Sequence, residues 1–190
     1  MKRRDFLGSL LAAAAALVAG GAASRPRGGG LRYLRPPGAL PEREFLARCI
    51  HCGQCGEVCP NRCILYFGYQ NGPASVDTPY ILPREQACIL CMRCGEVCPT
   101  DAIAQIPHAM GPILERVHMG RAHIDKHLCL SYQGKTCGVC YRACPLQDVA
   151  IRVGMLEQPQ ILDGCVGCGL CERSCIQLPQ AIRIIPRHEA

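Results

Sequence analysis

The sequence predicts an α+β fold built from two fused modules of similar design. A cysteine run recurs four times, with a period of about 40 residues. Short β-prone stretches follow the runs, which indicates strands between compact loops. The 190 residues include 17 Cys but no Trp and only three Phe, so hydrocarbon packing alone does not account for the core. A group bound by the cysteines would add to the stability of such a fold.

Residues 1–23 have the layout of an export signal. Arg3 and Arg4 precede an apolar run at 10–19 and small residues at 20–23. The apolar run is shorter than the roughly twenty residues that a membrane span needs. We therefore expect a twin-arginine signal and a periplasmic protein. Cleavage at the end of this segment and its retention as an anchor both remain open.

The segments before the first cysteine are expected to differ in structure. Residues 24–41 are rich in Arg, Gly and Pro and are predicted to be a flexible linker or an arm that wraps the surface. Residues 42–48 are predicted to form a short helix. The region 42–190 then holds the four cysteine motifs, near 49–60, 88–99, 129–145 and 165–175.

Two of the motifs follow the pattern C-x2-C-x2-C-x3-C-P without deviation. Motif one is Cys49, Cys52, Cys55 and Cys59, and motif two is Cys88, Cys91, Cys94 and Cys98. Motif four, Cys165, Cys168, Cys171 and Cys175, keeps the spacing but has Ile176 in place of the proline. Motif three, Cys129, Cys137, Cys140 and Cys144, has a stretched first interval. These sixteen cysteines are the predicted metal ligands, and Cys63 is left over.

This spacing is typical of cysteines that bind [4Fe–4S] clusters. Three cysteines at two-residue intervals let one loop reach three irons of a cluster, and in bacterial two-cluster ferredoxins the fourth cysteine ligates the other cluster. The sequence therefore predicts four [4Fe–4S] clusters on two ferredoxin-like modules. Motif one can pair with two and three with four, or one with four and two with three. The spacing does not choose between these pairings.

Each repeat is expected to run from strand to cluster loop to one-turn helix to strand. The predicted strands are 64–66, 80–82, 102–104, 149–151, 160–162 and 181–184. Pro60, Pro99 and Pro145 are expected to end the helices. Loop glycines would let backbone N–H groups approach the sulfurs, namely Gly53, Gly56, Gly95, Gly138, Gly167 and Gly169.

Other uses of the cysteines fit the pattern less well. A disulfide framework has no need of four nearly identical runs, and zinc commonly uses two separated C-x-x-C pairs. Cys63 is interpreted as a buried thiol, although it could ligate in place of Cys59. The insertion at 130–136 in motif three could open that site, but a loop of this length closes at small entropic cost.

Charge and the other polar residues indicate no second function. The formal net charge of +6 falls to +4 without residues 1–23. Four thiolate-bound clusters at roughly −2 each would make the protein mildly acidic, which argues against nucleic-acid binding. No catalytic triad order, phosphate loop or carboxylate pair is found. The histidines considered as ligands do not follow the Rieske pattern and are interpreted as solvated or capping residues, namely His51, His108, His118, His123 and His127.

Several segments besides the cysteine runs carry a family likeness. They are the Arg3-Arg4 signal, 35–41 (RPPGALP), 44–49 (EFLARC), 138–145 (GVCYRACP) and 164–172 (GCVGCGLCE). In these segments the chain resembles the MauM/NapG family of ferredoxin-type proteins. The resemblance implies a periplasmic protein with four [4Fe–4S] clusters beside a membrane-embedded, quinol-oxidising ferredoxin-type partner, NapH or MauN. It implies nitrate reduction in the NapG branch and methylamine utilisation in the MauM branch. The regular spacing of motif two favours the MauM-like side.

We therefore expect an electron-transfer protein without a catalytic site of its own. It would pass single electrons between the membrane partner and a periplasmic redox enzyme, and the protein would set the position and potential of each cluster. The alternative is a maturation factor that helps to assemble such an enzyme. A catalytic subunit is disfavoured because no substrate site is visible in the sequence.

Overall fold

The computed structural model describes residues 33–73 and 75–187. The predicted export signal and the first part of the predicted arm lie outside the described residues. The described residues belong to one compact unit. None of their helices is both long enough and apolar enough to cross a membrane.

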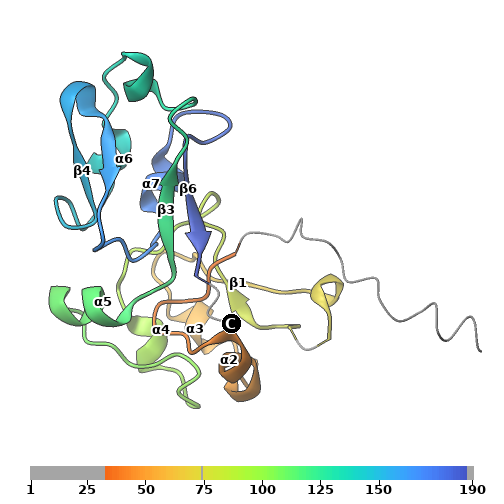
Figure 1. The fold of residues 1–190 in the computed structure, drawn as a ribbon. Helices are drawn as coiled ribbons and strands as arrows, with labels where there is room; N and C mark the ends of the chain where they lie inside the picture. The colour runs from red at the N-terminus through yellow and green to blue at the C-terminus, as the bar shows by residue number, and fades with distance from the viewer. Residues whose placement is uncertain (1–32, 74, 188–190) are drawn as a thin grey trace, which may run out of the picture. The chain divides into compact units, whose positions relative to one another are not determined.

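The helices are short, and most of them belong to the cysteine motifs (Figure 1). The seven-residue helices are α2 (Glu42–Arg48) and α5 (Met110–Arg116). The one-turn helices are α3 (Gln54–Glu57), α4 (Arg93–Glu96), α6 (Val139–Arg142) and α7 (Leu170–Ser174). Three 3-10 turns are η1 (Tyr69–Asn71), η2 (Leu130–Gln133) and η3 (Met155–Glu157). The predicted helix at 42–48 is confirmed, and α3, α4 and α6 end before the predicted prolines.

In the described residues the strands form three separate two-stranded antiparallel sheets. Strand β1 (Leu65–Tyr66) pairs with β2 (Pro79–Tyr80), and β4 (Ile151–Val153) pairs with β5 (Pro159–Ile161). Strand β3 (Gly120–Ile124) pairs with β6 (Ile182–Pro186) over five residues each, and Figure 1 shows the two side by side. Four of the predicted strands overlap β1, β2, β5 and β6, whereas 149–151 meets β4 only at Ile151 and 102–104 makes only an isolated bridge. Strand β3 was not predicted.

The same pairing pattern occurs twice along the chain. We call residues 33–118 the first half and 119–187 the second half. In the second half the hairpin β4–β5 falls between the paired strands β3 and β6 in sequence. In the first half the hairpin β1–β2 falls between Ala39 and Ile103, which form an antiparallel bridge. This repetition supports two modules of one design.

The described part of the predicted arm is packed into the protein, which corrects the expectation of a surface linker. Leu34 is 1% exposed and forms an antiparallel bridge with Ile81. The Arg35 Nε donates a hydrogen bond to Glu42 over 2.8 Å. Proline and glycine content says how a segment bends, but not whether another segment covers it. Through the bridge between Ala39 and Ile103, the arm takes in the first half the place that β3 takes in the second.

The core is made of aliphatic side chains interleaved with cysteines. Its largest fully buried side chains include Phe45, Leu34, Ile81, Met92 and Val117. Buried cysteines from both halves belong to the same apolar cluster of side chains. The interior is therefore arranged around the thiols, as the scarcity of aromatic residues indicates.

Candidate metal centres

Each cysteine motif turns from its loop into its one-turn helix in the same way. The residue before the helix has a positive φ in all four, namely Gly53 (75°), Met92 (59°), Gly138 (54°) and Gly169 (89°). A left-handed residue next to right-handed ones directs successive N–H groups to one side, which forms a concave surface suited to anions. Met92 adopts this conformation at a cost of roughly 1–2 kcal/mol, so the surrounding fold imposes the shape of the loop.

Of the five histidines considered as ligands, one lines a cysteine cavity and four do not. His51 lines a cysteine cavity, but its φ of 58° repeats the values at Leu90 (59°) and Gly167 (76°). Each of these three residues precedes the second cysteine of its motif. His51 therefore occupies a position where the loop needs a left-handed residue, and this accounts for its place beside the cavity without a role as a ligand. The other four histidines are exposed and lie outside the cysteine cavities.

The cysteines gather around four separate cavities, which we name sites I to IV. Site I is lined by Cys49, Cys52, Cys55 and Cys98. Site II is lined by Cys59, Cys88, Cys91 and Cys94, with Cys63 beside them. Site III is lined by Cys129, Cys137, Cys140 and Cys175. Site IV is lined by Cys144, Cys165, Cys168 and Cys171. Each of the sixteen predicted cysteines lines one site.

The fourth cysteine of each motif crosses to a neighbouring site, and this defines the pairing of the motifs. Cys98 of motif two lies in site I, and Cys59 of motif one lies in site II. Cys175 and Cys144 cross in the same way between sites III and IV. The motifs thus pair in sequential order. The nested pairing would have brought Cys175 to site I, and the structure does not do so.

The four-cysteine linings suit a group that contains several metal atoms better than a single ion. Zinc would bring four ligand atoms to about 2.3 Å from one point. Among the described residues, no three His, Cys, Asp or Glu side chains come close enough together to hold one ion. Four thiols around a cavity instead fit an iron–sulfur cluster, whose irons are each held by one thiolate.

Backbone N–H groups approach several of the cysteine sulfurs. The Leu90 N–H donates a hydrogen bond to Cys88 Sγ over 3.4 Å, and the Ile103 N–H donates to Cys98 Sγ over 3.4 Å. In the second half, the N–H of Ala122 in β3 donates a hydrogen bond to Cys165 Sγ over 3.5 Å. Such hydrogen bonds favour a thiolate over a thiol, and they are among the features that set cluster potentials.

Burial favours the protonated form of several of the thiols when no metal is bound. In each site, loss of solvent raises the pKa of at least one cysteine: Cys55 to about 11, Cys94 to about 12, Cys140 to about 11 and Cys168 to about 12. Only the thiolate is a metal ligand, so metal binding releases these protons. The sites are thus built for a group whose positive charge compensates for buried thiolates.

The insertion in motif three is folded and does not displace its cysteines. Residues 130–133 form η2, and the Tyr132 hydroxyl donates a hydrogen bond to the Pro159 carbonyl over 3.0 Å. Ser131 is 1% exposed and lines site III, and its Oγ has no hydrogen-bond partner among the described residues. Cys129 therefore reaches the same cavity as Cys137 and Cys140. Sequence spacing alone gave no signal for Ser131.

Contacts between neighbouring sites arrange them in the order I, II, IV, III. Cys55 of site I lies close enough to Cys94 of site II for ionisation of Cys55 to raise the pKa of Cys94. The N–H of Cys88 in site II donates a hydrogen bond to the carbonyl of Cys168 in site IV over 3.0 Å. Cys140 of site III likewise raises the pKa of Cys171 in site IV. The two inner sites therefore meet where the halves are in contact.

The outer sites are more open than the inner sites. Cys52 of site I is exposed, whereas the inner sites each have two buried cysteines from their main motif. The apolar side chains at the outer sites are the more exposed: Ile50 at site I is 61% exposed and Ile176 at site III is 62% exposed, against 41% for Ile89 at site II. Ile176 is the residue that replaces the usual proline after motif four.

The seventeenth cysteine is buried, as predicted, and it lies at site II. Cys63 is 2% exposed, and its Sγ is 3.6 Å from the Sγ of Cys59. A hydrogen bond between Cys63 and Cys88 lowers the pKa of Cys63 and raises that of Cys88. Site II is therefore surrounded by five thiols.

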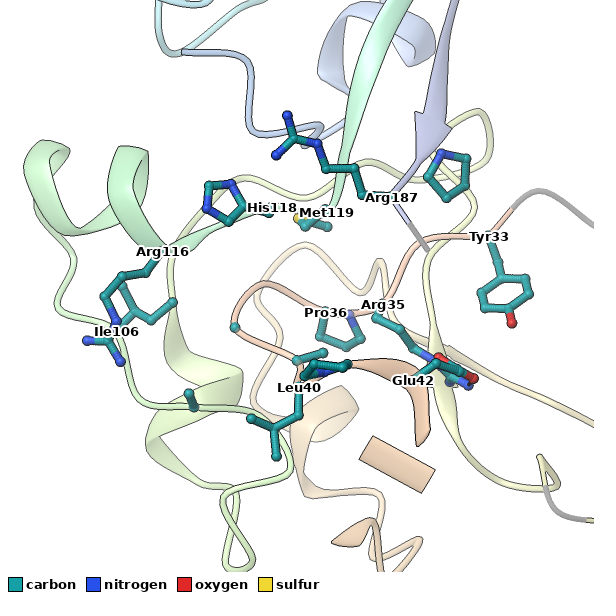
Figure 2. A pocket seen from close by; sticks show the side chains of 15 residues that line it. Tyr33, Arg35, Pro36, Leu40, Glu42, Ile106, Arg116, His118, Met119 and Arg187 are labelled. Atoms are coloured by element: carbon teal, nitrogen blue, oxygen red, sulfur yellow. Dashed lines mark hydrogen bonds and ion pairs between the residues drawn. The ribbon is translucent and has the colours of Figure 1, made fainter. Parts of the chain in front are cut away.

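A further cleft of about 290 Å³ has no cysteine in its lining (Figure 2). It is bordered by the arm and by residues that lead into β3 and out of β6, so it marks the junction of the two halves. Arg35 pairs with Glu42 at its edge. The side chains of Arg116, His118 and Arg187, which Figure 2 shows around the cleft, make no hydrogen bond or ion pair with other described residues. The cleft is not a candidate metal centre.

Comparisons with known proteins agree with this picture. A family model described as a 4Fe–4S dicluster domain matches residues 48–102, which contain the cysteines of sites I and II, and a 4Fe–4S binding domain matches 162–175. The chain is 39% identical over 163 residues to the methylamine utilization ferredoxin-type protein MauM of Methylophilus methylotrophus, covering 81% of this chain and 71% of that protein. It is 34% identical over 201 aligned positions to the ferredoxin-type protein NapG of Escherichia coli, covering 97% and 85%.

Proposed function

Because the chain belongs to the MauM/NapG family of ferredoxin-type iron–sulfur proteins, we propose that it is a periplasmic carrier of single electrons with four [4Fe–4S] clusters. The observation that carries this proposal is the row of four cavities, each lined by four cysteines. The sixteen cysteines predicted from the sequence are the proposed ligands.

Each [4Fe–4S] cluster, when bound, takes up or gives back one electron at a potential set by its surroundings. The chain contributes the surroundings. The cysteines would hold the irons, and the left-handed loops direct N–H groups towards the sulfurs. The aliphatic core excludes water from the inner sites, where Cys88, Cys94, Cys168 and Cys171 are buried. Low exposure strengthens the effect of each N–H···S hydrogen bond.

The contact between sites II and IV supports a carrier that is continuous from one end to the other. A backbone hydrogen bond joins Cys88 directly to Cys168, so the two inner sites are in direct contact. The outer sites carry exposed apolar side chains, Ile50 and Ile176. Exposed apolar residues beside a redox site favour docking of another protein. We propose that the two partners dock at these two ends.

The proposed partners are a membrane-embedded, quinol-oxidising ferredoxin-type protein of the NapH or MauN kind and a periplasmic redox enzyme. The relatives give two pathways for this enzyme, since one is named for methylamine utilization and the other is NapG. A methylamine-type pathway is favoured by the regular spacing of motif two. The proposed location rests on the arginine pair and the apolar run of residues 1–23.

Metal analysis of anaerobically purified protein tests the proposal first. We expect about sixteen irons and sixteen acid-labile sulfides per chain, with little zinc. Zinc with little iron or sulfide, persisting after cluster reconstitution, would overturn it. An iron content of about twelve would mean that one of the four sites holds no cluster.

Reduction by quinol tests the carrier role itself. Membranes containing the partner should reduce the purified protein faster than membranes lacking it. A full complement of iron combined with a rate equal to that background would contradict electron transfer and favour a maturation factor.

A further inference from the structure

Site II differs from the other sites because a fifth thiol lies at its cavity. Cys63 lines the cavity together with Cys59, Cys88, Cys91 and Cys94. Its Sγ lies within hydrogen-bond distance of Cys59 Sγ, at 3.6 Å. Cys88 lines the same cavity as Cys63. Cys63 therefore lies beside Cys59 and shares a cavity with all four proposed ligands.

A tight turn brings Cys63 back beside Cys59. The Arg62 N–H donates a hydrogen bond to the Cys59 carbonyl over 3.1 Å, and Arg62 has a φ of 46°. Asn61 holds the turn, since its side-chain amide donates to the Ala87 carbonyl over 2.6 Å. These two hydrogen bonds hold the turn that places Cys63 beside Cys59.

Site I contains the same turn with alanine in place of this cysteine. After Cys98, Asp101 has a φ of 52°, as Arg62 has after Cys59. The next residue is Ala102, which is 1% exposed and lines site I, as Cys63 lines site II. The two sites are thus a natural pair, one with a spare thiol and one with a methyl group at the same position.

We propose that Cys63 is an exchangeable ligand of site II, able to bind the iron that Cys59 otherwise holds. This inference rests on the proposed four-cluster function. In the exchange, the bond between Cys59 Sγ and iron breaks and a bond from Cys63 Sγ to the same iron forms. The proton of the Cys63 thiol passes to Cys59 Sγ, so no oxidant or reductant is needed. Site II then keeps its cluster when Cys59 is removed.

Matched alanine substitutions at sites II and I test this inference. Cys59→Ala should keep about sixteen irons per chain, while Cys59→Ala with Cys63→Ala should fall to about twelve. Cys98→Ala, which has no spare thiol nearby, should also fall to about twelve. Cys63→Ala alone should keep the full iron content because Cys59 remains. Electron paramagnetic resonance of the reduced proteins should show one altered signal in Cys59→Ala and one missing signal in the double variant.

Introducing a spare thiol at site I allows a second test by iron content. Adding Ala102→Cys to Cys98→Ala should restore the iron content from about twelve to about sixteen. The inference is overturned if Cys59→Ala loses as much iron as Cys98→Ala does. If Cys59→Ala does not fold, failure of Ala102→Cys to restore site I overturns it instead. An unsubstituted protein with far fewer than sixteen irons would contradict the proposed function, so the two failures are distinguishable.

Discussion

The two halves repeat one design, yet they achieve it with different sequences. The second half has five-residue outer strands, β3 and β6, whereas the first half makes its outer pair from the arm and a single bridge, Ala39 with Ile103. The first half has regular motifs and a spare thiol at site II. The second half has an insertion in motif three and no cysteine beyond its eight predicted ligands.

What both halves retain identifies the features that the sites need. The left-handed residue before each one-turn helix recurs at all four sites, although one of the four is Met92. The crossing of the fourth cysteine also recurs. The proline after the fourth cysteine does not, because Ile176 occupies that place after motif four. The loop conformation and the exchanged ligand therefore define the design more than the spacing or the proline does.

The largest expected difference between the halves concerns the fourth cysteine of the inner sites. Cys144 serves site IV as Cys59 serves site II, but no spare thiol lies beside it. Cys144→Ala should therefore lose about four irons per chain, whereas Cys59→Ala should lose none. Iron analysis of the two variants measures this directly.

Cys175→Ala is the control, because it should empty site III and leave sites I and II intact. Loss of the signals of site I or II in that variant would contradict the sequential pairing of the motifs. Equal iron loss in Cys144→Ala and Cys59→Ala would remove the difference between the halves.

Cysteine spacing predicted the location of the sites because a cluster loop is a local structure. The positions of all four loops, their one-turn helices and most of the strands follow from short stretches of sequence. The packing of the arm could not be predicted in this way, because Leu34 and Ile81 are distant in sequence and meet only in the folded chain. The same holds for β3, whose pairing with β6 joins residues on opposite sides of motifs three and four.

The sequence could not predict which two motifs share a pair of sites. Both pairings satisfy the spacing, and only the folded chain brings Cys98 to site I and Cys175 to site III. Cys63 could be predicted to be buried, but its proximity to Cys59 depends on the turn at Arg62. Non-local contacts thus decide what the local motifs leave open.

A moderate loss of stability is expected when the contact between the arm and the rest of the first half is removed. The Arg35 guanidinium binds Glu42, donates to the Thr78 hydroxyl over 3.0 Å and to the Pro79 carbonyl over 2.7 Å. Arg35→Ala should therefore lower the free energy of unfolding by about 1–3 kcal/mol, since it leaves buried acceptors unpaired. Thermal unfolding of the holoprotein measures the change.

The matched control is the ion pair between Arg121 and Asp163 in the second half, which is far more exposed. Its side chains are 42% and 100% exposed, against 11% and 30% for Arg35 and Glu42. Arg121→Ala should change the free energy of unfolding by about 0–1 kcal/mol. Equal effects of the two substitutions would show that the arm is not fastened through Arg35.

The smallest expected effect tests a feature that only the second half possesses. The Ser131 hydroxyl is buried at site III without a partner among the described residues, and a buried hydroxyl normally donates a hydrogen bond. A cluster sulfur at site III would be its acceptor. Such a bond stabilises the reduced form, which carries more negative charge, so its removal lowers the potential.

Ser131→Ala should therefore lower the midpoint potential of one cluster by on the order of tens of millivolts, with the iron content unchanged. A redox titration followed by electron paramagnetic resonance measures this shift. Thr100→Val is the comparison in the first half, because the Thr100 hydroxyl lies 3.8 Å from Cys98 Sγ at site I and is less buried. It should shift a different signal by a smaller amount. If Ser131→Ala leaves every potential unchanged, the hydroxyl is a packing residue of the insertion, and the insertion then contributes only the position of Cys129 to site III.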